Sequence, residues 1–395
     1  MAGEMFYNSS GNGRRRNGQK DESPMLHVVD IVMTVVSVLV AVASLLTLPV
    51  PYVSPARLGV LPVLAPVAPI IFVGMAVMML YWIIRWKWRR AAVMIALTFV
   101  GMLYMPRYFV PQLRRTGEES ANYPRSAIRV MSYNVRCFYP DDRSDDYTVD
   151  SIAAFVSRFN PDIICFQEFL THNSKIERRF DSLLGDYRRA VLAEVHPPVA
   201  IYSRFRIIDK GRVAYLDRDS LPQGKGLWAD VAVGNDTVRV FNVHLNGTSI
   251  TGYDADYIVN YRYMSDTARN RKLYSMVRRL NSNTVSRSYH VDALSAALAE
   301  TTRPRILCGD FNDTPMSYAY QRLSRDMKDA FRECGHGYSH TFRGFFDLLR
   351  IDFALFDEGR FDVLSYEVPD SVCWSDHLPV CVRAVLNEKQ EMTAR

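Results

Sequence analysis

Ile306-Leu307-Cys308-Gly309-Asp310-Phe311-Asn312-Asp313 is the stretch that decides the fold, because an apolar run here ends in a carboxylate and a carboxamide two residues apart. Alternate residues of a strand project to the same face, so Asp310 and Asn312 are predicted to lie on one side of the strand end. A carboxylate offers oxygen ligands to a hard divalent cation, and an Asn amide can hold a water or a phosphoryl oxygen without adding negative charge. The same residue types also suit an ordinary turn after a strand. The stretch therefore indicates a metal and phosphate site only if partners occur elsewhere.

Polar residues also mark five further apolar segments, in order along the chain. They are Asn134 after 130–133, Glu168 after 163–167, Asn242 and His244 within 238–245, Asp352 after 350–351, and Asp376 and His377 before 378–380. Singly, each has a structural explanation: Glu168 could cap a helix, His244 could be a hydrogen-bonded core histidine, and Asp376 could cap a turn. Several carboxylates gathered together would repel one another without a cation, so the whole set predicts a metal-binding site.

From about residue 126 to 386 the chain resembles the endonuclease/exonuclease/phosphatase superfamily, which includes deoxyribonuclease I, exonuclease III-type repair nucleases, neutral sphingomyelinases and inositol polyphosphate phosphatases. Six motifs carry the resemblance in the family's order: Ser132-Tyr133-Asn134, Gln167-Glu168, Asn242-Val243-His244, Gly309-Asp310-Phe311-Asn312, Arg350-Ile351-Asp352 and Ser375-Asp376-His377. The resemblance implies an α/β fold, a four-layer αββα sandwich of the deoxyribonuclease I type. It also implies a hydrolase acting on phosphoester bonds, with its active site where strand ends converge at one rim.

The resemblance further implies a bound Mg²⁺ or Mn²⁺. Glu168 would be the principal metal ligand, and Asn134 on the neighbouring strand would support it. Asp376 would lie near the metal or at a second metal position. The motifs leave open whether one or two metal ions bind.

The same motifs imply a set of catalytic and substrate-binding residues. The catalytic set is His244, Asp310, Asn312, Asp352 and His377, and the substrate-binding set is Asn242, His244 and Asn312. Asp310 would orient or deprotonate the attacking water or help to bind metal, and Asn312 would hold a phosphoryl oxygen. His377, polarised by Asp352, would be the base or a transition-state contact, while His244 would touch the phosphate or protonate the leaving oxygen. The implied reaction is in-line attack of water on phosphorus, most simply in a phosphodiester.

The motif Asn242-Val243-His244 narrows the branch of the superfamily. It follows the deoxyribonuclease, sphingomyelinase and phosphatase branches, because exonuclease III-type enzymes usually carry a Tyr-containing Pro-Asn segment there. An abasic-site repair role is therefore disfavoured. Nucleic acid, a phospholipid headgroup and a small phosphoester all stay open as substrates. The alternative function is a catalytically silent binding scaffold, which has no physical need for clustered carboxylates.

Three apolar runs precede this domain and predict a membrane anchor. The runs 28–50 and 58–84 each exceed the roughly 20 residues that span a bilayer. The run 91–105 is shorter, but it can span if the aromatic segment up to residue 110 lies at headgroup level. A re-entrant or interfacial helix is the alternative for this third run. We predict an anchor of three helices at about 28–50, 58–84 and 91–110.

Basic residues around these runs predict the topology. Arg14, Arg15, Arg16 and Lys20 precede the first run, Arg85, Lys87, Arg89 and Arg90 lie between the second and third, and only Arg57 separates the first from the second. The positive-inside rule places both basic clusters in the cytoplasm. Three spans then predict an integral protein of the inner or plasma membrane with an extracytoplasmic catalytic domain, whereas two spans would keep that domain in the cytoplasm.

Composition supports this division of the chain. The predicted parts are a disordered basic tail (1–26), the membrane region (27–110), a linker (111–125), the catalytic domain (126–387) and a short tail (388–395). Residues 1–116 hold 12 Lys and Arg against 4 Asp and Glu, whereas 117–395 hold 36 against 38, so the basic excess belongs to the anchor. A slightly acidic domain is poorly suited to binding long nucleic acid.

Within the catalytic domain, the Arg- and Tyr-rich segment 257–280 predicts either a solvated helix or a substrate-gating insertion. The six cysteines show no metal-binding spacing.

Overall fold

The computed structural model describes residues 24–111, 123–139, 145–169, 174–192, 198–216, 222–247, 266–344 and 347–388. The predicted disordered tail falls almost wholly outside the described residues, as do most of the predicted linker and the last seven residues. All six cysteines lie within the described ranges, and none forms a disulfide.

Two six-stranded sheets form the centre of the catalytic domain. One sheet has the order β10 (Met327–Asp329), β12 (Asp352–Asp357), β9 (Arg305–Asp310), β8 (Asp236–His244), β7 (Pro222–Val233) and β6 (Ile207–Leu216). The other has the order β13 (Phe361–Glu367), β14 (Val380–Leu386), β2 (Ala127–Asn134), β3 (Ile163–Gln167), β5 (Val199–Ser203) and β4 (Arg188–Ala190). In each sheet one central pair is parallel, namely β8 with β9 and β2 with β3, and the other pairs are antiparallel.

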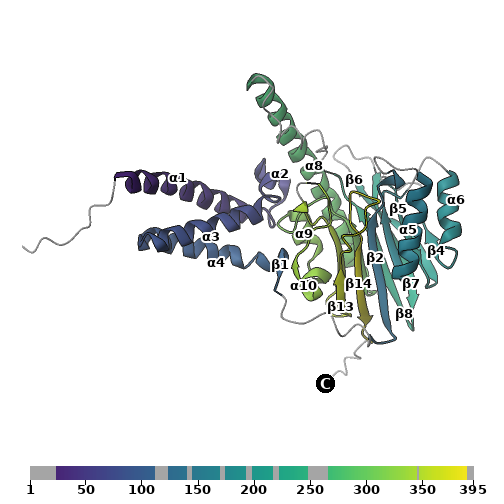
Figure 1. Ribbon diagram of the computed structural model, residues 1–395. Helices are drawn as coiled ribbons and strands as arrows, with labels where there is room; N and C mark the ends of the chain where they lie inside the picture. The colour runs from purple at the N-terminus through teal and green to yellow at the C-terminus, as the bar shows by residue number, and fades with distance from the viewer. Residues whose placement is uncertain are drawn as a thin grey trace, which may run out of the picture.

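Alternating side chains explain why the sheets stack as a sandwich. Along β3, Ile163 and Cys165 point into the core between the two sheets, whereas Ile164 and Phe166 point to the outer helices. Helices α5 (Asp145–Phe159) and α6 (Ser174–Leu183) cover that outer face, and α8 (Asp266–Glu300) and α9 (Tyr318–Leu323) cover the other sheet (Figure 1). A short helix, α10 (Ala330–Cys334), packs beside β13. Strands buried on both faces need apolar residues at every position. The predicted four-layer sandwich is confirmed.

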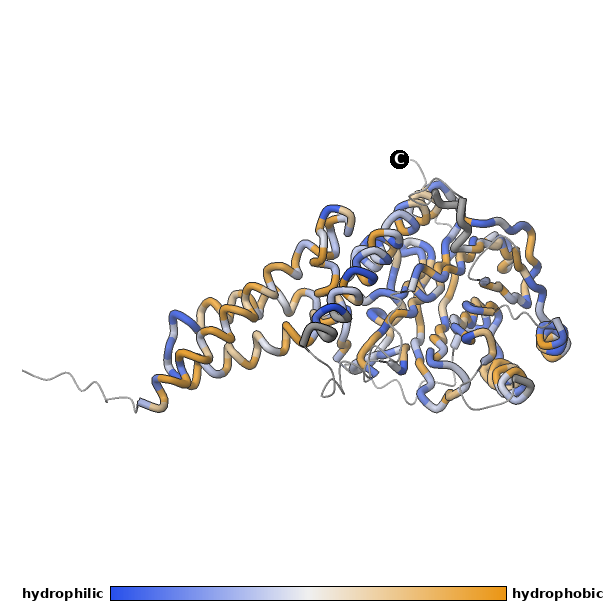
Figure 2. Tube along the Cα trace, turned by 90° about the horizontal axis from the view of Figure 1, so that it is seen from above, coloured by the Kyte–Doolittle hydropathy of each residue, from blue (hydrophilic) through white to orange (hydrophobic). Residues whose placement is uncertain are grey.

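The N-terminal region forms three helices that project from this sandwich as a rod, two running toward it and the middle one running away (Figure 1). They are α1 (Pro24–Thr47), α3 (Ala68–Ile84) and α4 (Trp88–Met102), with the short helices α2 (Pro55–Leu58), η1 (Leu61–Leu64) and η2 (Met105–Arg107) at the domain end. Most residues of α1 and α4 face outward and are apolar (Figure 2). The turn between α3 and α4, with its basic residues, lies at the end remote from the catalytic domain.

The second predicted span is shorter than its apolar run. Proline cannot continue a helix interior, and Pro62, Pro66 and Pro69 divide the run into η1 and α3. The resulting helix α3 has 17 residues, so it is shorter than the span predicted over 58–84. By length and composition, two segments could cross a membrane, namely Pro24–Thr47 and Trp88–Arg107. The third apolar run, for which the sequence allowed either a span or an interfacial helix, therefore lies in one of the two segments long enough to cross a membrane.

Polar contacts hold the rod together. Asp30 of α1 accepts two hydrogen bonds from the Arg85 guanidinium, each 2.9 Å, and one of 2.6 Å from the Tyr81 hydroxyl. The Trp82 indole N–H donates to Ser37 Oγ at 2.8 Å. These side chains join α1 to the end of α3 near the basic turn, so the apolar run tolerates its one carboxylate because that carboxylate is fully paired.

The rod also docks firmly on the catalytic domain. The strand β1 (Phe109–Val110) pairs with β11 (Gly337–Tyr338). Arg107 donates to the Pro315 carbonyl at 3.0 Å and its own carbonyl accepts from Arg350 at 2.9 Å. Arg350 is buried and forms an ion pair with Asp329. The last helix of the rod is thus tied to the loop that follows the Gly309-Asp310-Phe311-Asn312 motif.

Candidate active site

Strand register brings the predicted residues together. In the parallel pair β8 and β9, His244 lies opposite Asp310, and in the antiparallel pair β12 and β9, Asp352 also lies opposite Asp310. Asn134 lies opposite Gln167, the residue before Glu168, in the parallel pair β2 and β3. Because the two sheets face each other, these strand ends meet at one rim of the sandwich, as the sequence predicted.

Gly309 permits the close approach of β8 and β9. A Cβ atom at this position would lie 2.0 Å from the Val243 carbonyl oxygen, which no real side chain can do. Its φ of 151° also lies in a region that residues with a Cβ rarely adopt. The glycine of the motif is therefore explained by the backbone geometry that sets His244 beside Asp310.

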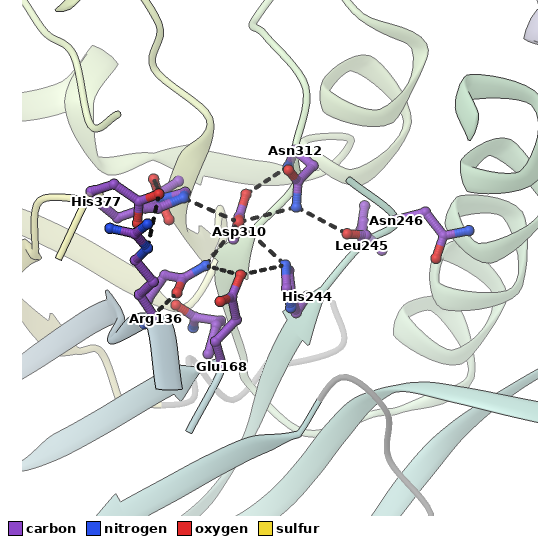
Figure 3. A network of polar contacts seen from close by, with 12 residues as sticks. Arg136, Glu168, His244, Leu245, Asn246, Asp310, Asn312 and His377 are labelled. Atoms are coloured by element: carbon purple, nitrogen blue, oxygen red, sulfur yellow. Dashed lines mark hydrogen bonds and ion pairs between the residues drawn. The ribbon is translucent and has the colours of Figure 1, made fainter. Parts of the chain in front are cut away.

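Asp310 is the centre of the site (Figure 3). Its Oδ2 accepts from Asn134 Nδ2 at 3.2 Å and from Asn312 Nδ2 at 3.0 Å, and its Oδ1 accepts from the Asn312 backbone N–H at 2.7 Å. The same Oδ2 lies 3.5 Å from His244 Nε2 and 3.8 Å from His377 Nε2. One buried carboxylate thus contacts four of the predicted residues.

Burial changes the acidity of this carboxylate. Loss of solvent raises the pKa of Asp310 to about 6, and the nearby Asp352 carboxylate adds to the rise, while His377 and His244 oppose it. A carboxylate with a pKa near 6 is ionised at neutral pH and is still basic enough to take a proton from a water.

His377 is oriented by Asp352. Its Nδ1 lies 2.9 Å from Asp352 Oδ2, and the Thr341 hydroxyl accepts from the Asp352 backbone N–H at 3.0 Å. Burial disfavours the charged ring, but the carboxylates of Asp352 and Asp310 outweigh it and raise the pKa of His377 to about 10. The two carboxylates thus favour the protonated ring, and its Nε2 lies 3.8 Å from Asp310 Oδ2.

Glu168 and His244 form the more open side of the site. The Glu168 side chain is 30% exposed, against 1% for that of Asp310, and its Oε1 lies 3.6 Å from His244 Nε2. Glu168, Arg136 and Asn312 all adopt positive φ values, of 47°, 47° and 52°. Non-glycine residues with positive φ are uncommon and concentrate at functional sites, where the surrounding structure holds them.

The donor set fits a divalent cation. Carboxylate oxygens of Asp310 and Asp352 and a ring nitrogen of His377 lie within 4.8 Å of one another, and the buried Asp352 Oδ1 has no hydrogen-bond partner. Three carboxylates converge here when Glu168 is included, with no Lys or Arg among the described residues that neutralises Asp310. Hard oxygen donors of this kind suit Mg²⁺ or Mn²⁺.

Asn242, which the sequence predicted to bind substrate, lies away from the cluster around Asp310. The side chain is fully buried between the sheets. Its amide donates to the carbonyls of Phe166 at 2.9 Å and Ala200 at 2.8 Å, and its oxygen accepts from Gln167 at 2.7 Å. Asn242 thus joins one sheet to the other. It lies on the same face of β8 as His244, but two residues farther from the strand end and so deeper between the sheets.

Asp376 and Asn134, two of the predicted metal ligands, lie in different settings. Asp376 is 39% exposed and lies 3.7 Å from Arg136 Nε, outside the cluster of Asp310, Asp352 and His377. Asn134 presents its amide nitrogen to Glu168 and Asp310, while its oxygen accepts from the Arg136 backbone N–H at 3.0 Å. Both residues stay predicted metal ligands. Glu168 remains the predicted principal ligand.

A buried ion pair that supports the site was not predicted from the sequence. Arg287 of α8 donates to Asp313 Oδ2 at 2.5 Å and to the Asn246 carbonyl at 2.9 Å, and it is 2% exposed. It therefore holds the loop after Asn312 and the chain after His244 in place at once. A charged residue on the inner face of a helix is the signal that could have revealed it.

Such a rim of carboxylates and histidines at the strand ends of an αββα sandwich defines a phosphoester hydrolase. The chain belongs to the endonuclease/exonuclease/phosphatase family, whose profile matches residues 131–377. A second profile, a domain of unknown function (DUF8431), matches residues 30–108, which contain most of the helical rod. A comparison with curated proteins gave no match.

Several solved structures are similar to part of this chain at low sequence identity. The mannosyl-6-phosphatase of Bacteroides thetaiotaomicron is 20% identical, with a TM-score of 0.46 over 66% of this chain and 100% of that one. The human Nocturnin catalytic domain with bound sulfate is 16% identical, with a TM-score of 0.48 over 67% and 96%. The D. rerio TDP2 complex with single-strand DNA product is 11% identical, with a TM-score of 0.46 over 66% and 99%.

Proposed function

We propose that this protein is a membrane-anchored, divalent-metal-dependent phosphoesterase that hydrolyses a phosphodiester by in-line attack of water. The observation that carries the proposal is the environment of Asp310, a buried carboxylate within 3.8 Å of His377, His244, Asn134 and Asn312. A buried anion with this many convergent polar neighbours is typical of a catalytic centre rather than of a packed core.

The chain's own residues divide the work as follows. Asp310 accepts the proton of the attacking water, and Asn312 and Asn134 fix the direction of its oxygens. His377, charged and held by Asp352, donates to the phosphoryl oxygens as negative charge builds there. His244, at 3.6 Å from Glu168, lies on the other side of Asp310 and gives a proton to the leaving oxygen.

Glu168 would hold the metal at the open side of the site, with Asp310 as the adjoining oxygen donor. A bound divalent cation supplies Lewis-acid polarisation of the phosphoryl group and offsets the repulsion between these carboxylates and an anionic substrate. Asp352 keeps its place as the partner of His377.

Anchoring favours a substrate found at a membrane. The helices α1 and α4 both run toward the catalytic domain, and the basic turn between α3 and α4 lies at the remote end. We infer that the rod spans the bilayer and carries the catalytic domain on the extracytoplasmic side. The near-neutral charge of residues 117–395 favours a phospholipid headgroup or a small phosphoester over long nucleic acid.

The test is hydrolysis by the full chain in detergent, because removal of the anchor would expose the surface on which Arg107 and β1 dock. DNA, RNA, sphingomyelin, phosphoinositides, phosphatidylglycerol and a chromogenic phosphodiester are offered with Mg²⁺, with Mn²⁺ and with EDTA. Turnover that EDTA removes and either metal restores is expected, and the substrate preferred names the class. Failure of a folded, metal-binding protein to hydrolyse any of them would argue for the scaffold alternative.

A further inference from the structure

Helix α8 is longer than the sandwich requires. It has 35 residues, and its C-terminal half packs on the sheet through Val291, Leu294 and Leu298. Figures 1 and 2 show its N-terminal half projecting beyond the sheets, beside the domain-side end of the rod. We call residues 266–283 the basic arm. The predicted helix over 257–280 is thus confirmed only from Asp266 onward, since 248–265 lie outside the described residues.

The basic arm differs in charge from the domain that carries it. It contains five Lys and Arg against one Asp, whereas residues 117–395 as a whole are slightly acidic. Arg271, Tyr274 and Arg278 follow one another at helical spacing and are exposed, and Tyr274 is 70% exposed. Met276, on another face, is buried. The arm therefore presents a basic stripe with an aromatic residue in the middle of it.

The location of the arm matches that of a membrane surface. Helix α8 packs against α2 and η1, which connect α1 to α3 on the domain side of the rod. Arg57 of α2 is exposed at the same junction. Where the rod would leave the bilayer, the protein thus places a basic helix and a further arginine side by side.

We propose that the basic arm lies on the bilayer surface and binds anionic phospholipid headgroups through Arg271 and Arg278, with Tyr274 at the interface. The proposal rests on the membrane anchoring proposed above. Basic residues near an anionic surface each add roughly fivefold to its affinity, and tyrosine prefers the membrane interface. A nucleic acid would fit the charge of the arm but not its position at the anchor junction, nor the acidic balance of the rest of the domain.

Lipid contact at the basic arm affects the active site because helix α8 carries both the arm and Arg287, which supports the site. Arg287 lies nine residues beyond Arg278 on α8 and holds Asp313 and the Asn246 carbonyl beside the site. With the arm on the headgroups, the rod and α8 fix the catalytic rim at two points relative to the bilayer. The arm then presents that rim to substrates held in the same leaflet.

The experiment measures how close the arm lies to headgroups in the full chain. A maleimide dye is placed at Tyr274→Cys, and at Ser182→Cys on α6 as the matched exposed site far from the rod. Each protein is reconstituted in nanodiscs of phosphatidylcholine alone or with phosphatidylglycerol, with a nitroxide quencher on the headgroups. The labelled wild-type chain gives the background from native cysteines. Hydrolysis in detergent is recorded for every variant.

Quenching at position 274 is expected to rise at least about twofold with phosphatidylglycerol and to fall again at high salt. Arg271→Glu with Arg278→Glu removes the rise, Arg271→Lys with Arg278→Lys keeps it, and position 182 shows none. Quenching that ignores lipid charge and both double variants, or no quenching at all, would overturn the proposal. So would capture of a single-stranded DNA oligonucleotide that depends on these arginines without lipid proximity. Unchanged turnover in detergent separates failure of the arm from failure of the proposed hydrolysis.

Discussion

Two of the buried aspartates, Asp30 and Asp310, lie in very different settings. Asp30 in the rod is 4% exposed and is matched by one guanidinium and one hydroxyl, with three hydrogen bonds of 2.6 to 2.9 Å. Asp310 in the catalytic domain is 1% exposed and shares its surroundings with the carboxylates of Asp352 and Glu168. Asp30 is neutralised by a single partner, whereas Asp310 is not.

This difference in charge pairing distinguishes a structural ion pair from a reactive group. A buried charge with a complete set of partners fixes the packing of helices and has no further capacity to react. A buried charge whose neighbours are partly of the same sign can be neutralised only by a proton, an imidazolium or a cation. The comparison predicts that the two aspartates fail in opposite ways when they are replaced.

The largest effect is expected for Asp310→Asn. Loss of the proton acceptor should lower kcat by about 1000-fold or more. In EDTA the thermal stability should rise or stay the same, because the substitution removes a carboxylate that burial disfavours. Melting curves and turnover of the preferred substrate test both parts. The matched control is Asp376→Asn, a partly exposed carboxylate outside the cluster, for which less than a tenfold loss is expected. Equal losses for the two variants would refute the central place of Asp310.

Asn242→Ala should show the reverse pattern. It removes three buried hydrogen bonds between the sheets, including those to the carbonyls of Phe166 and Ala200, at a cost of about 3 kcal/mol. The melting temperature should fall by several degrees, while kcat and KM of the folded enzyme stay within about threefold. Asn312→Ala is the contrast, with lost activity and little loss of stability. A selective rise in KM for Asn242→Ala would instead support its predicted role in substrate binding.

Asp30→Asn tests the structural ion pair between Asp30 and Arg85. The variant leaves Arg85 without its bidentate partner, and we expect the rod to lose about 2 kcal/mol of stability. Turnover in detergent should be unchanged, because the ion pair lies at the end of the rod remote from the site. Differential scanning fluorimetry of the solubilised chain gives the first quantity. The double variant Asp30→Asn with Arg85→Gln should recover part of the loss, and its failure to do so would mean that packing rather than charge holds α1 to α3.

The smallest expected effect is a gradual change of the hydrolysis rate with pH. Asp310 must be ionised to accept a proton, and its pKa is raised to about 6. The rate should therefore be level near neutrality and fall about tenfold per pH unit below 6. Added divalent metal favours the ionised carboxylate and should move this limb to lower pH. A rate that stays constant down to pH 4 at limiting metal would exclude Asp310 as the proton acceptor.

The sandwich could be predicted because the motifs that carry the family resemblance are short and local. The runs ending at Asn134, Glu168, His244 and Asp310 are apolar on both faces, and they are the central strands of the two sheets. The motifs also predicted that these residues meet, since strand ends of two stacked sheets share a rim. Such inferences require only short windows of sequence.

What the sequence missed depends on contacts between distant segments. The role of Asn242 could not be read from its position two residues before His244, because its partners Gln167, Phe166 and Ala200 belong to the opposite sheet. The partnership of Arg287 with Asp313 joins a helix to a loop 26 residues later. The shortening of the second apolar run was readable in principle from Pro62, Pro66 and Pro69, since proline breaks helices whatever surrounds it.

The central claim is that the carboxylate rim works with a metal, and the most direct test is the Mg²⁺ dependence of hydrolysis by the full chain beside Glu168→Gln. The wild type should be inactive in EDTA and saturate with Mg²⁺. Glu168→Gln should keep the fold and require at least about tenfold more Mg²⁺ to reach its own lower maximum. Undiminished hydrolysis in EDTA, or the same Mg²⁺ requirement in both proteins, would contradict the account.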